Sequence, residues 1–420
     1  MLGWIAGAAA VAALIVVVAN LWIRGDQIRH RIEPLYGAED PQFRRAISTL
    51  LGPTLLEGNR ITPLDHGDRI FPAMLEAIRS ARRTITFETF IYWKGEIGRE
   101  FAEAMAERAR AGVRVHVLLD WVGTQKIDAG SMELMKNAGV EVCRYRPLHW
   151  WNVTRVNNRT HRKLLVVDGR IGFTGGVGIA DVWSGNAQDP EHWRDTHFRV
   201  EGPVVGQMQA AFLDNWVESE SRLLHGDDYF PHLDAAGDEL ANMFMSAPEN
   251  GTESARLLYL LAIASAKRRI RIASAYFIPD RLSIEMLCEA RKRGVEVQIL
   301  VPGKNIDTKV TRRASRALWG PLLEGGIEIF EFQPTMLHAK VMIVDDVFTS
   351  VGSTNFDNRS FKLNDEANLN ILSRAAGEEQ SRVFDQDLKR AKRITFEAWR
   401  KRPLREKAVE RLASLLRWEL

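Results

Sequence analysis

The chain has 420 residues, of which 45% are hydrophobic and 26% are charged. This length and composition suit two globular domains and exclude a disordered chain. Its 57 Lys and Arg residues nearly balance its 54 Asp and Glu residues, so the charge gives no support for a nucleic-acid partner. Cys143 and Cys288 have neither zinc-site nor disulfide-framework spacing and are expected to be buried thiols.

Residues 1–23 are predicted to form a membrane anchor, because residues 2–23 carry no charged side chain. As a helix, this segment is long enough to cross a hydrocarbon core of about 30 Å. A cleaved signal peptide is the alternative, but it favours a basic start and a shorter apolar core. Arg24, Arg29 and Arg31 follow, so the positive-inside rule predicts a single-pass inner-membrane protein whose remaining residues are cytoplasmic.

Two kinds of periodicity alternate after this anchor. Residues 24–60 are polar and are expected to form an irregular juxtamembrane segment. Residues 73–85 and 99–112 then have helical periodicity, whereas residues 85–92 and 113–120 are typical of strands. This order predicts parallel α/β units.

The same order returns in the second half of the chain. Residues 262–277 match residues 77–92, and residues 289–303 match residues 107–120. The match predicts two homologous domains that pack about a pseudo-twofold axis. Their expected bounds are residues 61–235 and 236–387.

The remaining residues, 388–420, are basic and carry Leu and Trp residues at helical spacing. Such a segment suits a helix that lies on an anionic membrane surface. A helix packed on the second domain explains the same pattern equally well.

One short motif, HxKxxxxD, occurs twice. Its copies are His161, Lys163, Asp168 and His338, Lys340, Asp345. An apolar run follows the Lys in each copy, and a strand there would place the His and Lys side chains on one face. A chance pair on two edge strands is the plain alternative, and the duplication argues against it.

This pairing suits displacement at a phosphodiester. One imidazole can attack phosphorus, a second can protonate the leaving alkoxide, and two lysines can hold the charged oxygens. Neither a metal ion nor another cofactor is required by this scheme.

The residues that follow each copy carry a resemblance to a known family. Residues 338–366 read HAKVMIVDDVFTSVGSTNFDNRSFKLNDE, and residues 193–203 read WRDTHFRVEGP. With its twin HxKxxxxD motifs, the chain resembles the phospholipase D superfamily from about residue 60 to residue 405. Within that superfamily it is most similar to bacterial cardiolipin synthases.

The resemblance implies an α/β fold of two homologous α/β/α sandwich domains, which the transmembrane helix predicted from the apolar run would precede. It implies that His161 is the nucleophile and His338 the general acid, although the symmetry of the two copies leaves this assignment open. It further implies that Asp195 and Glu366 orient the two imidazoles, since a buried acid on the far ring nitrogen fixes the tautomer.

Other motif residues have expected supporting roles. Asp168 and Asp345 complete the triplets, but they follow their strands and are expected to be structural carboxylates that accept backbone or lysine hydrogen bonds. Ser353 and Asn355 belong to the GSxN motif of the second half. The first half departs from this pattern, because Gly178 stands where an amide is expected beside the phosphate.

The resemblance implies a membrane-anchored phosphatidyltransferase that converts phosphatidylglycerol into cardiolipin and glycerol through a phosphohistidine. Its partners would be phospholipid substrates and an anionic membrane surface, with no nucleic acid. The alternatives are a phospholipase D that yields phosphatidic acid, a superfamily nuclease and, given Gly178, an inactive membrane scaffold. The acceptor alcohol, the acyl preference and the oligomeric state are not specified by the sequence.

Overall fold

The computed structural model describes residues 28–147, 157–247 and 253–417. The predicted anchor, residues 1–23, lies outside this part of the chain. Within the described ranges, no helix is both long enough and apolar enough to cross a membrane.

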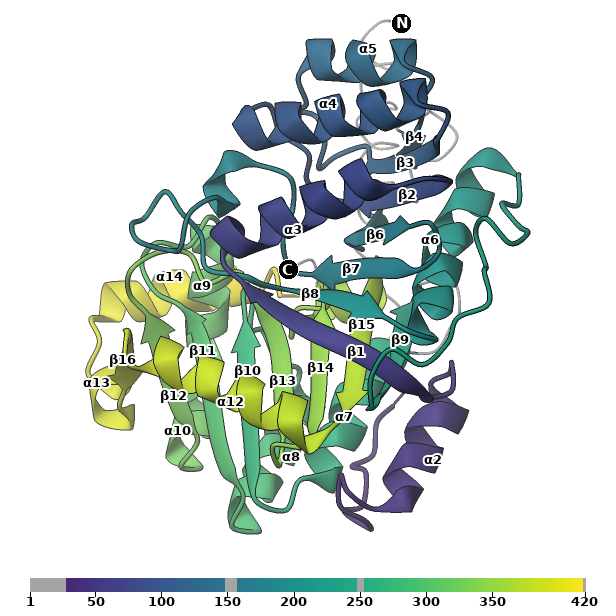
Figure 1. The fold of residues 1–420 in the computed structure, drawn as a ribbon. Coiled ribbons are helices and arrows are strands. Elements are labelled where there is room, and N and C mark those ends of the chain that lie inside the picture. Colours follow the sequence, from purple (N-terminus) through teal and green to yellow (C-terminus); the bar gives the residue numbers. More distant parts are fainter. Residues whose placement is uncertain (1–27, 148–156, 248–252, 418–420) are drawn as a thin grey trace, which may run out of the picture.

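A mixed sheet runs through both halves of the chain (Figure 1). The strands of the first half are β1 (Leu56–Asp65), β2 (Thr84–Thr89), β3 (Arg114–Asp120), β4 (Glu141–Tyr145), β5 (Arg159–Thr160), β6 (Leu164–Val167), β7 (Ile171–Gly175) and β8 (Thr196–Glu201). Those of the second half are β9 (Glu239–Ser246), β10 (Arg269–Ser274), β11 (Glu296–Pro302), β12 (Glu328–Phe332), β13 (Lys340–Val344), β14 (Phe348–Gly352), β15 (Asn364–Leu372) and β16 (Ala391–Ile394).

Helices cover the faces of this sheet. Those of the first half are α2 (Pro41–Leu50), α3 (Gly67–Ser80), α4 (Glu96–Arg110), α5 (Ala129–Asn137) and α6 (Val204–Glu220). Those of the second half are α7 (Ser254–Ser265), α8 (Arg281–Lys292), α9 (Lys309–Ala317), α10 (Trp319–Glu324), α11 (Asn358–Lys362), α12 (Arg374–Leu388), α13 (Phe396–Arg400) and α14 (Leu404–Ser414). Ile270 and Ile272 of β10 pack in the core that includes α7 and α8, whereas Ala273 packs in the core that includes α12. The second half is therefore layered as helix, sheet and helix.

The strand order is palindromic about the β1–β9 pair. From the centre outward, the first half runs β1-β8-β7-β6-β2-β3-β4 and the second runs β9-β15-β14-β13-β10-β11-β12, with β16 added at the edge. β1 and β9 pair antiparallel, as two copies related by a twofold axis require. The predicted duplication is confirmed. The predicted parallel order holds only for β2-β3-β4 and β10-β11-β12, because the other strand pairs within each half are antiparallel.

Corresponding residues of the two halves have corresponding environments. Ile85 and Ile270 are fully buried in β2 and β10. Gly112 and Gly294 follow the ends of α4 and α8 with φ of 90° and 93°, which glycine adopts without steric cost. The sequence match between the halves therefore reflects the same backbone path.

The first predicted helix ends earlier than its periodicity indicates, at Ser80 instead of residue 85. Asp168 explains the difference, because its carboxylate accepts the backbone N–H groups of residues 82, 83 and 84 at 2.7–3.2 Å. In the second half, Asp345 accepts the N–H groups of residues 267, 268 and 269 at 2.7–2.8 Å. Each aspartate thus fixes the turn that leads from a helix into β2 or β10.

Residues 24–60 are not irregular throughout, contrary to the expectation. Asp40 caps α2 by accepting from the N–H of Gln42 at 2.8 Å, and Pro41 begins the helix. Phe43 is buried, and its ring meets that of Phe348 edge to face with centroids 5.2 Å apart. This segment therefore packs against the second half of the chain.

The predicted helix over residues 388–420 is likewise only partly correct. β16 joins the sheet by pairing antiparallel with β12, and α13 and α14 follow it. α14 packs on the domain, since Glu410 is buried and paired with Arg316 and Arg402 at 2.9 and 2.6 Å. Leu412, Leu415 and Leu416 remain exposed at its end.

The two cysteines have different environments. Cys143 in β4 is buried as expected, and burial raises its pKa to about 12. Cys288 in α8 is only half-buried, which corrects the expectation, and its thiol lies 3.6 Å from the carbonyl of Pro321.

Candidate active site

The two His-Lys pairs lie where each half of the chain meets the other. His161 and Lys163 follow β5 and precede β6, while His338 precedes β13, which begins at Lys340. The expectation that both pairs lie within strands is therefore wrong for all but Lys340. The backbone explains why: the N–H of His161 donates to the carbonyl of residue 365 at 2.9 Å, and that of His338 to the carbonyl of residue 194 at 2.7 Å. The backbone N–H group of each histidine thus pairs with a carbonyl of the opposite half.

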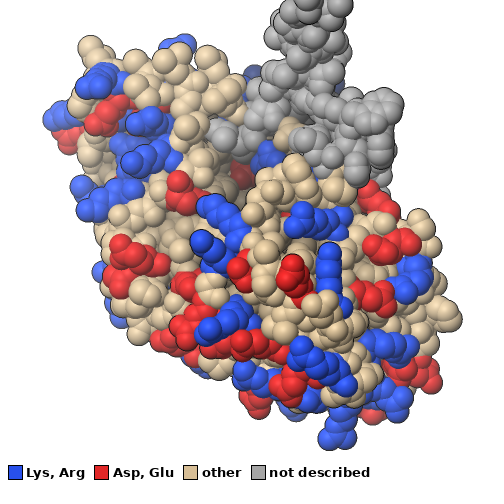
Figure 2. Space-filling model, turned by 90° about the horizontal axis from the view of Figure 1, so that it is seen from above, with Lys and Arg blue, Asp and Glu red and all other residues tan. Residues whose placement is uncertain are grey.

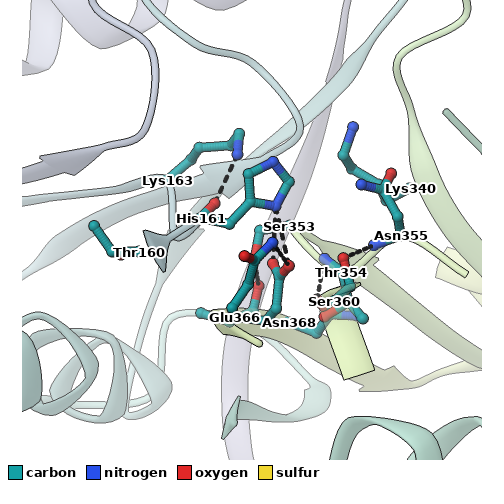
Figure 3. A network of polar contacts seen from close by, with 12 residues as sticks. Thr160, His161, Lys163, Lys340, Ser353, Thr354, Asn355, Ser360, Glu366 and Asn368 are labelled. Carbon is teal, nitrogen blue, oxygen red and sulfur yellow. Dashed lines mark hydrogen bonds and ion pairs between the residues drawn. The ribbon is translucent and has the colours of Figure 1, made fainter. Parts of the chain in front are cut away.

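Each imidazole is bound by a carboxylate of the opposite half. Nδ1 of His161 lies 3.0 and 3.1 Å from the two carboxylate oxygens of Glu366 (Figure 3). Nδ1 of His338 lies 2.7 Å from Oδ2 of Asp195. The residues that precede these carboxylates supply the two backbone carbonyls described above. Both histidines are therefore fixed at backbone and side chain by the other half.

Both carboxylates favour their ionised forms. Burial on its own raises the pKa of Asp195, but the neighbouring His338 and Lys340 outweigh this effect and bring the pKa down to about 2. Burial also acts to raise the pKa of Glu366, and His161 and Lys163 reverse the direction and lower it. The pair of acids therefore carries two negative charges at neutral pH.

Both imidazoles are neutral in the free protein. Burial lowers the pKa of His161 and of His338 to about 4, and the nearby lysines act in the same direction. Because Nδ1 faces a carboxylate in each case, it carries the hydrogen, and Nε2 keeps its lone pair. In His338, this lone pair lies 3.1 Å from Nζ of Lys340, which can donate to it. A neutral imidazole with a lone pair on Nε2 can act as a nucleophile or as a base.

Two buried lysines complete the centre. Nζ of Lys163 donates to the carbonyl of His161 and Nζ of Lys340 to that of His338, both at 2.6 Å. Figure 3 shows the two Nζ atoms on either side of the His161 ring. Burial and then the charge of Lys340 lower the pKa of Lys163 to about 7, and burial lowers that of Lys340 to about 8. A phosphate anion between them would relieve this unfavourable pairing.

Ser353 and Asn355 lie on the second-half side of this centre. Ser353 Oγ accepts from the N–H of Ala367 at 2.9 Å, so it links the GSxN loop to β15. Asn355 is buried, and its Oδ1 has no hydrogen-bond partner among the described residues. Its side chain lies beside Lys340 in Figure 3, where a ligand of the lysines would also meet the amide.

The structure does not bring the two triplet aspartates into this centre. Asp168 and Asp345 follow β6 and β13, whereas the His-Lys pairs lie at the starts of these strands. Strands of this length separate their ends by about 13–17 Å. Asp168 and Asp345 act instead in the turns described above.

Three aromatic residues at the site were not among the residues expected there from the sequence. Phe90 meets the ring of His161 edge to face with centroids 5.3 Å apart. The rings of Trp183 and Trp193 lie 5.2 and 5.5 Å from that of His338. The position of Trp193 directly before the RDTH segment was the available signal, while Phe90 and Trp183 had none.

Known proteins resemble most of this chain. The family described as "Cardiolipin synthase, PLD-like domain" matches residues 74–189 and 259–388, and each stretch contains one HxKxxxxD motif. Cardiolipin synthase 1 of Bacillus anthracis is 34% identical over 362 residues, which cover 84% of this chain and 71% of that protein. Cardiolipin synthase A of Pseudomonas putida is 34% identical over 356 residues, covering 84% and 73%. Among solved structures, the phosphatidylserine synthase of Haemophilus influenzae has a similar fold, with a TM-score of 0.68 at 14% identity over 90% of this chain and 100% of that one.

Proposed function

We propose that this chain, which belongs to the cardiolipin synthase family of phospholipase D-like proteins, is a phosphatidyltransferase that works through a phosphohistidine intermediate. The observation that carries the proposal is the pair of imidazole–carboxylate contacts, each made between the halves, beside two buried lysines. Phosphatidylglycerol is the proposed substrate, with cardiolipin and glycerol as the products.

In the first step, Nε2 of His161 attacks the phosphorus of one phosphatidylglycerol. A P–N bond forms while the P–O bond to the headgroup glycerol breaks, and His338 gives a proton to the departing oxygen. His338 is neutral in the free protein, but the bound diester is an anion whose charge raises the pKa of an adjacent imidazole. Lys163 and Lys340 bind the non-bridging oxygens as negative charge increases there.

In the second step, His338 is neutral and takes the proton from a hydroxyl of a second phosphatidylglycerol. The hydroxyl oxygen attacks phosphorus, the P–N bond breaks, and cardiolipin leaves. His161 and His338 return to their starting protonation states, so the cycle balances. Water in place of the second lipid would yield phosphatidic acid by the same route. We assign the nucleophile to His161 by its resemblance to duplicated relatives.

We also propose attachment to the inner membrane, with residues 1–23 as the anchor and both halves in the cytoplasm. The apolar run and the arginines that follow it support this orientation. A reporter fused to the C-terminus that is active only in the periplasm would contradict it.

The end of α14 supports a second membrane contact. Leu412, Leu415 and Leu416, here called the leucine surface, are 66%, 72% and 52% exposed. Asn358 Nδ2 donates to the carbonyl of Arg417 at 3.2 Å, and Asn358 is close in sequence to Asn355 of the candidate site. The segment that follows α14 is therefore tied to the start of α11, which comes shortly after the GSxN motif of the candidate site.

Basic side chains accompany the leucine surface. α14 carries Arg405, Lys407 and Arg411. Figure 2 shows Lys and Arg gathered on its left side, where α9, α13 and α14 lie in Figure 1. Positive charge beside exposed leucines suits a bilayer that contains anionic phosphatidylglycerol.

The first prediction concerns the products. The full-length protein, mixed with phosphatidylglycerol vesicles and a chelator, is expected to form cardiolipin and glycerol in equal amounts, measured by mass spectrometry. His161→Ala and His338→Ala are each expected to lower the rate by at least about a thousandfold, because each variant removes a group needed to break the first P–O bond.

His232→Ala is the matched control, because His232 is exposed and lies outside the site. It is expected to keep the wild-type rate. Phosphatidic acid as the main product would identify a hydrolase in place of a transferase. No turnover of any phospholipid by the wild type would contradict the proposed function.

The second prediction concerns pH. Lysines bind the diester only while protonated, and the lowered pKa values of about 7 and about 8 mean that this charge is lost as pH rises through that range. kcat/KM, which reports the free enzyme, is therefore expected to fall above about pH 7, far below the ordinary lysine pKa of about 10.4. kcat should fall at higher pH, since the bound anion raises both pKa values. A kcat/KM that stays constant to pH 9 would show that the lysines are not perturbed in this way.

The third prediction concerns the leucine surface. A variant with Ser at all three leucine positions is expected to act several-fold more slowly on intact vesicles, because docking raises the local lipid concentration. Its rate on detergent-dispersed lipid should equal that of the wild type. Leu223→Ser changes an exposed leucine of the first half and is the control. Equal vesicle rates for the triple variant and the wild type would overturn the docking proposal.

A further inference from the structure

Gly178 marks a clear difference between the two halves of the site. It occupies the place that Asn355 holds in the second half. A Cβ atom at Gly178 would lie 2.8 Å from Cβ of Ile91 and 3.1 Å from the ring of Trp183. The first distance is shorter than carbon atoms tolerate and the second is tight. No side chain therefore fits at position 178 while Ile91 and Trp183 keep their places.

Trp183 is itself held firmly. It ends a 3-10 turn, Asp181–Trp183, and is only 1% exposed. The carboxylate of Asp181 accepts the backbone N–H groups of Glu96 and Ile97 at 3.0 and 2.9 Å, which ties the turn to the start of α4. The Trp183 ring also meets that of Trp193 with centroids 4.8 Å apart.

The indole of Trp183 reaches the acid of the site. Its Nε1–H donates to Oδ2 of Asp195 at 3.0 Å. The same oxygen accepts from Nδ1 of His338 at 2.7 Å, and the rings of Trp183 and His338 meet edge to face. The other oxygen of Asp195 accepts the N–H of Thr196 at 2.8 Å. Three donors thus fix the orientation of this carboxylate.

The carboxylate of the second half is held differently. Glu366 accepts from His161 with both oxygens, and from the side-chain amide of Asn364 at 3.2 Å. The supporting hydrogen-bond donor is thus the amide of Asn364 for Glu366 and the indole of Trp183 for Asp195. The two imidazole–carboxylate pairs are therefore equivalent in topology but not in their supporting donors.

We propose that Trp183 is a positioning residue that holds Asp195, and through it the imidazole of His338, in space left free by the missing side chain at Gly178. The proposal rests on the function proposed above, because it concerns the same site. The indole of Trp183 then compensates for the side chain that is missing at Gly178, and Gly178 does not mark an inactive scaffold.

Trp183→Phe tests the proposal, because it keeps an aromatic ring and removes the N–H. kcat is expected to fall about 10- to 100-fold, the usual effect of losing a hydrogen bond to a charged group, with KM little changed. Trp216→Phe is the matched control. Trp216 is also buried, but its Nε1 has no hydrogen-bond partner among the described residues. Equal kcat values for the two variants would overturn the proposal.

A double variant separates positioning from simple packing. If Trp183 acts through Asp195, Trp183→Phe should have little further effect on kcat in an Asp195→Asn protein. If it only fills space, the two losses should multiply.

A measurement without substrate keeps this proposal separate from the proposed function. Loss of the indole donor leaves Asp195 more basic, so the pKa of His338, followed by NMR of ring-labelled histidine, is expected to rise in Trp183→Phe and not in Trp216→Phe. An unchanged His338 pKa would overturn the positioning role. Absence of lipid turnover by the wild type would instead overturn the function and leave this result standing.

Discussion

The candidate site depends on two imidazole–carboxylate contacts, in each of which one half of the chain supplies the carboxylate that binds the histidine of the other half. Glu366 of the second half binds His161 of the first, and Asp195 of the first half binds His338 of the second. The backbone also pairs across the halves, because the N–H of each histidine donates to the carbonyl of the residue that precedes its carboxylate partner. Neither half holds both members of an imidazole–carboxylate pair of the candidate site. The palindromic sheet therefore matters for function. The β1–β9 pair sets the relative position of the two halves, and that position determines both imidazole–carboxylate contacts.

The charges at this junction also constrain the chemistry. While both lysines are protonated, their charges cancel those of the two ionised acids in the site without ligand, and the two imidazoles are neutral. A bound phosphodiester adds one negative charge, and a proton on one imidazole restores the balance. Substrate binding thus supplies the protonated histidine that the first step needs. Lysines whose pKa values have fallen to about 7 and about 8 suit this task, because a bound anion raises both pKa values and favours the charged form.

The duplicated features were predictable from the sequence because they recur. The matched strands, the two glycines after α4 and α8, and the two HxKxxxxD motifs each appear twice at corresponding positions, and the structure shows them in corresponding environments. Features without a repeat were missed. α2 has few apolar residues and is stabilised by burial of Phe43 against the second half, and β16 exists because β12 offers an open edge. The crosswise pairing was also beyond sequence reasoning, which placed Asp195 and Glu366 beside the imidazoles but contains no distance between halves. Trp183 lacked any motif, and its contacts with Gly178 and Asp195 emerge only from the structure.

The crosswise pairing is tested most directly by NMR of ring-labelled histidine in Glu366→Gln and Asp195→Asn, with resonances assigned from the His161→Ala and His338→Ala proteins. Removing a carboxylate's charge lowers the pKa of the imidazole that it contacts. We therefore expect Glu366→Gln to shift the Nδ1 signal and lower the pKa of His161 while leaving His338 nearly unchanged, and Asp195→Asn to do the reverse. A result in which each substitution perturbs the histidine of its own half would contradict the account.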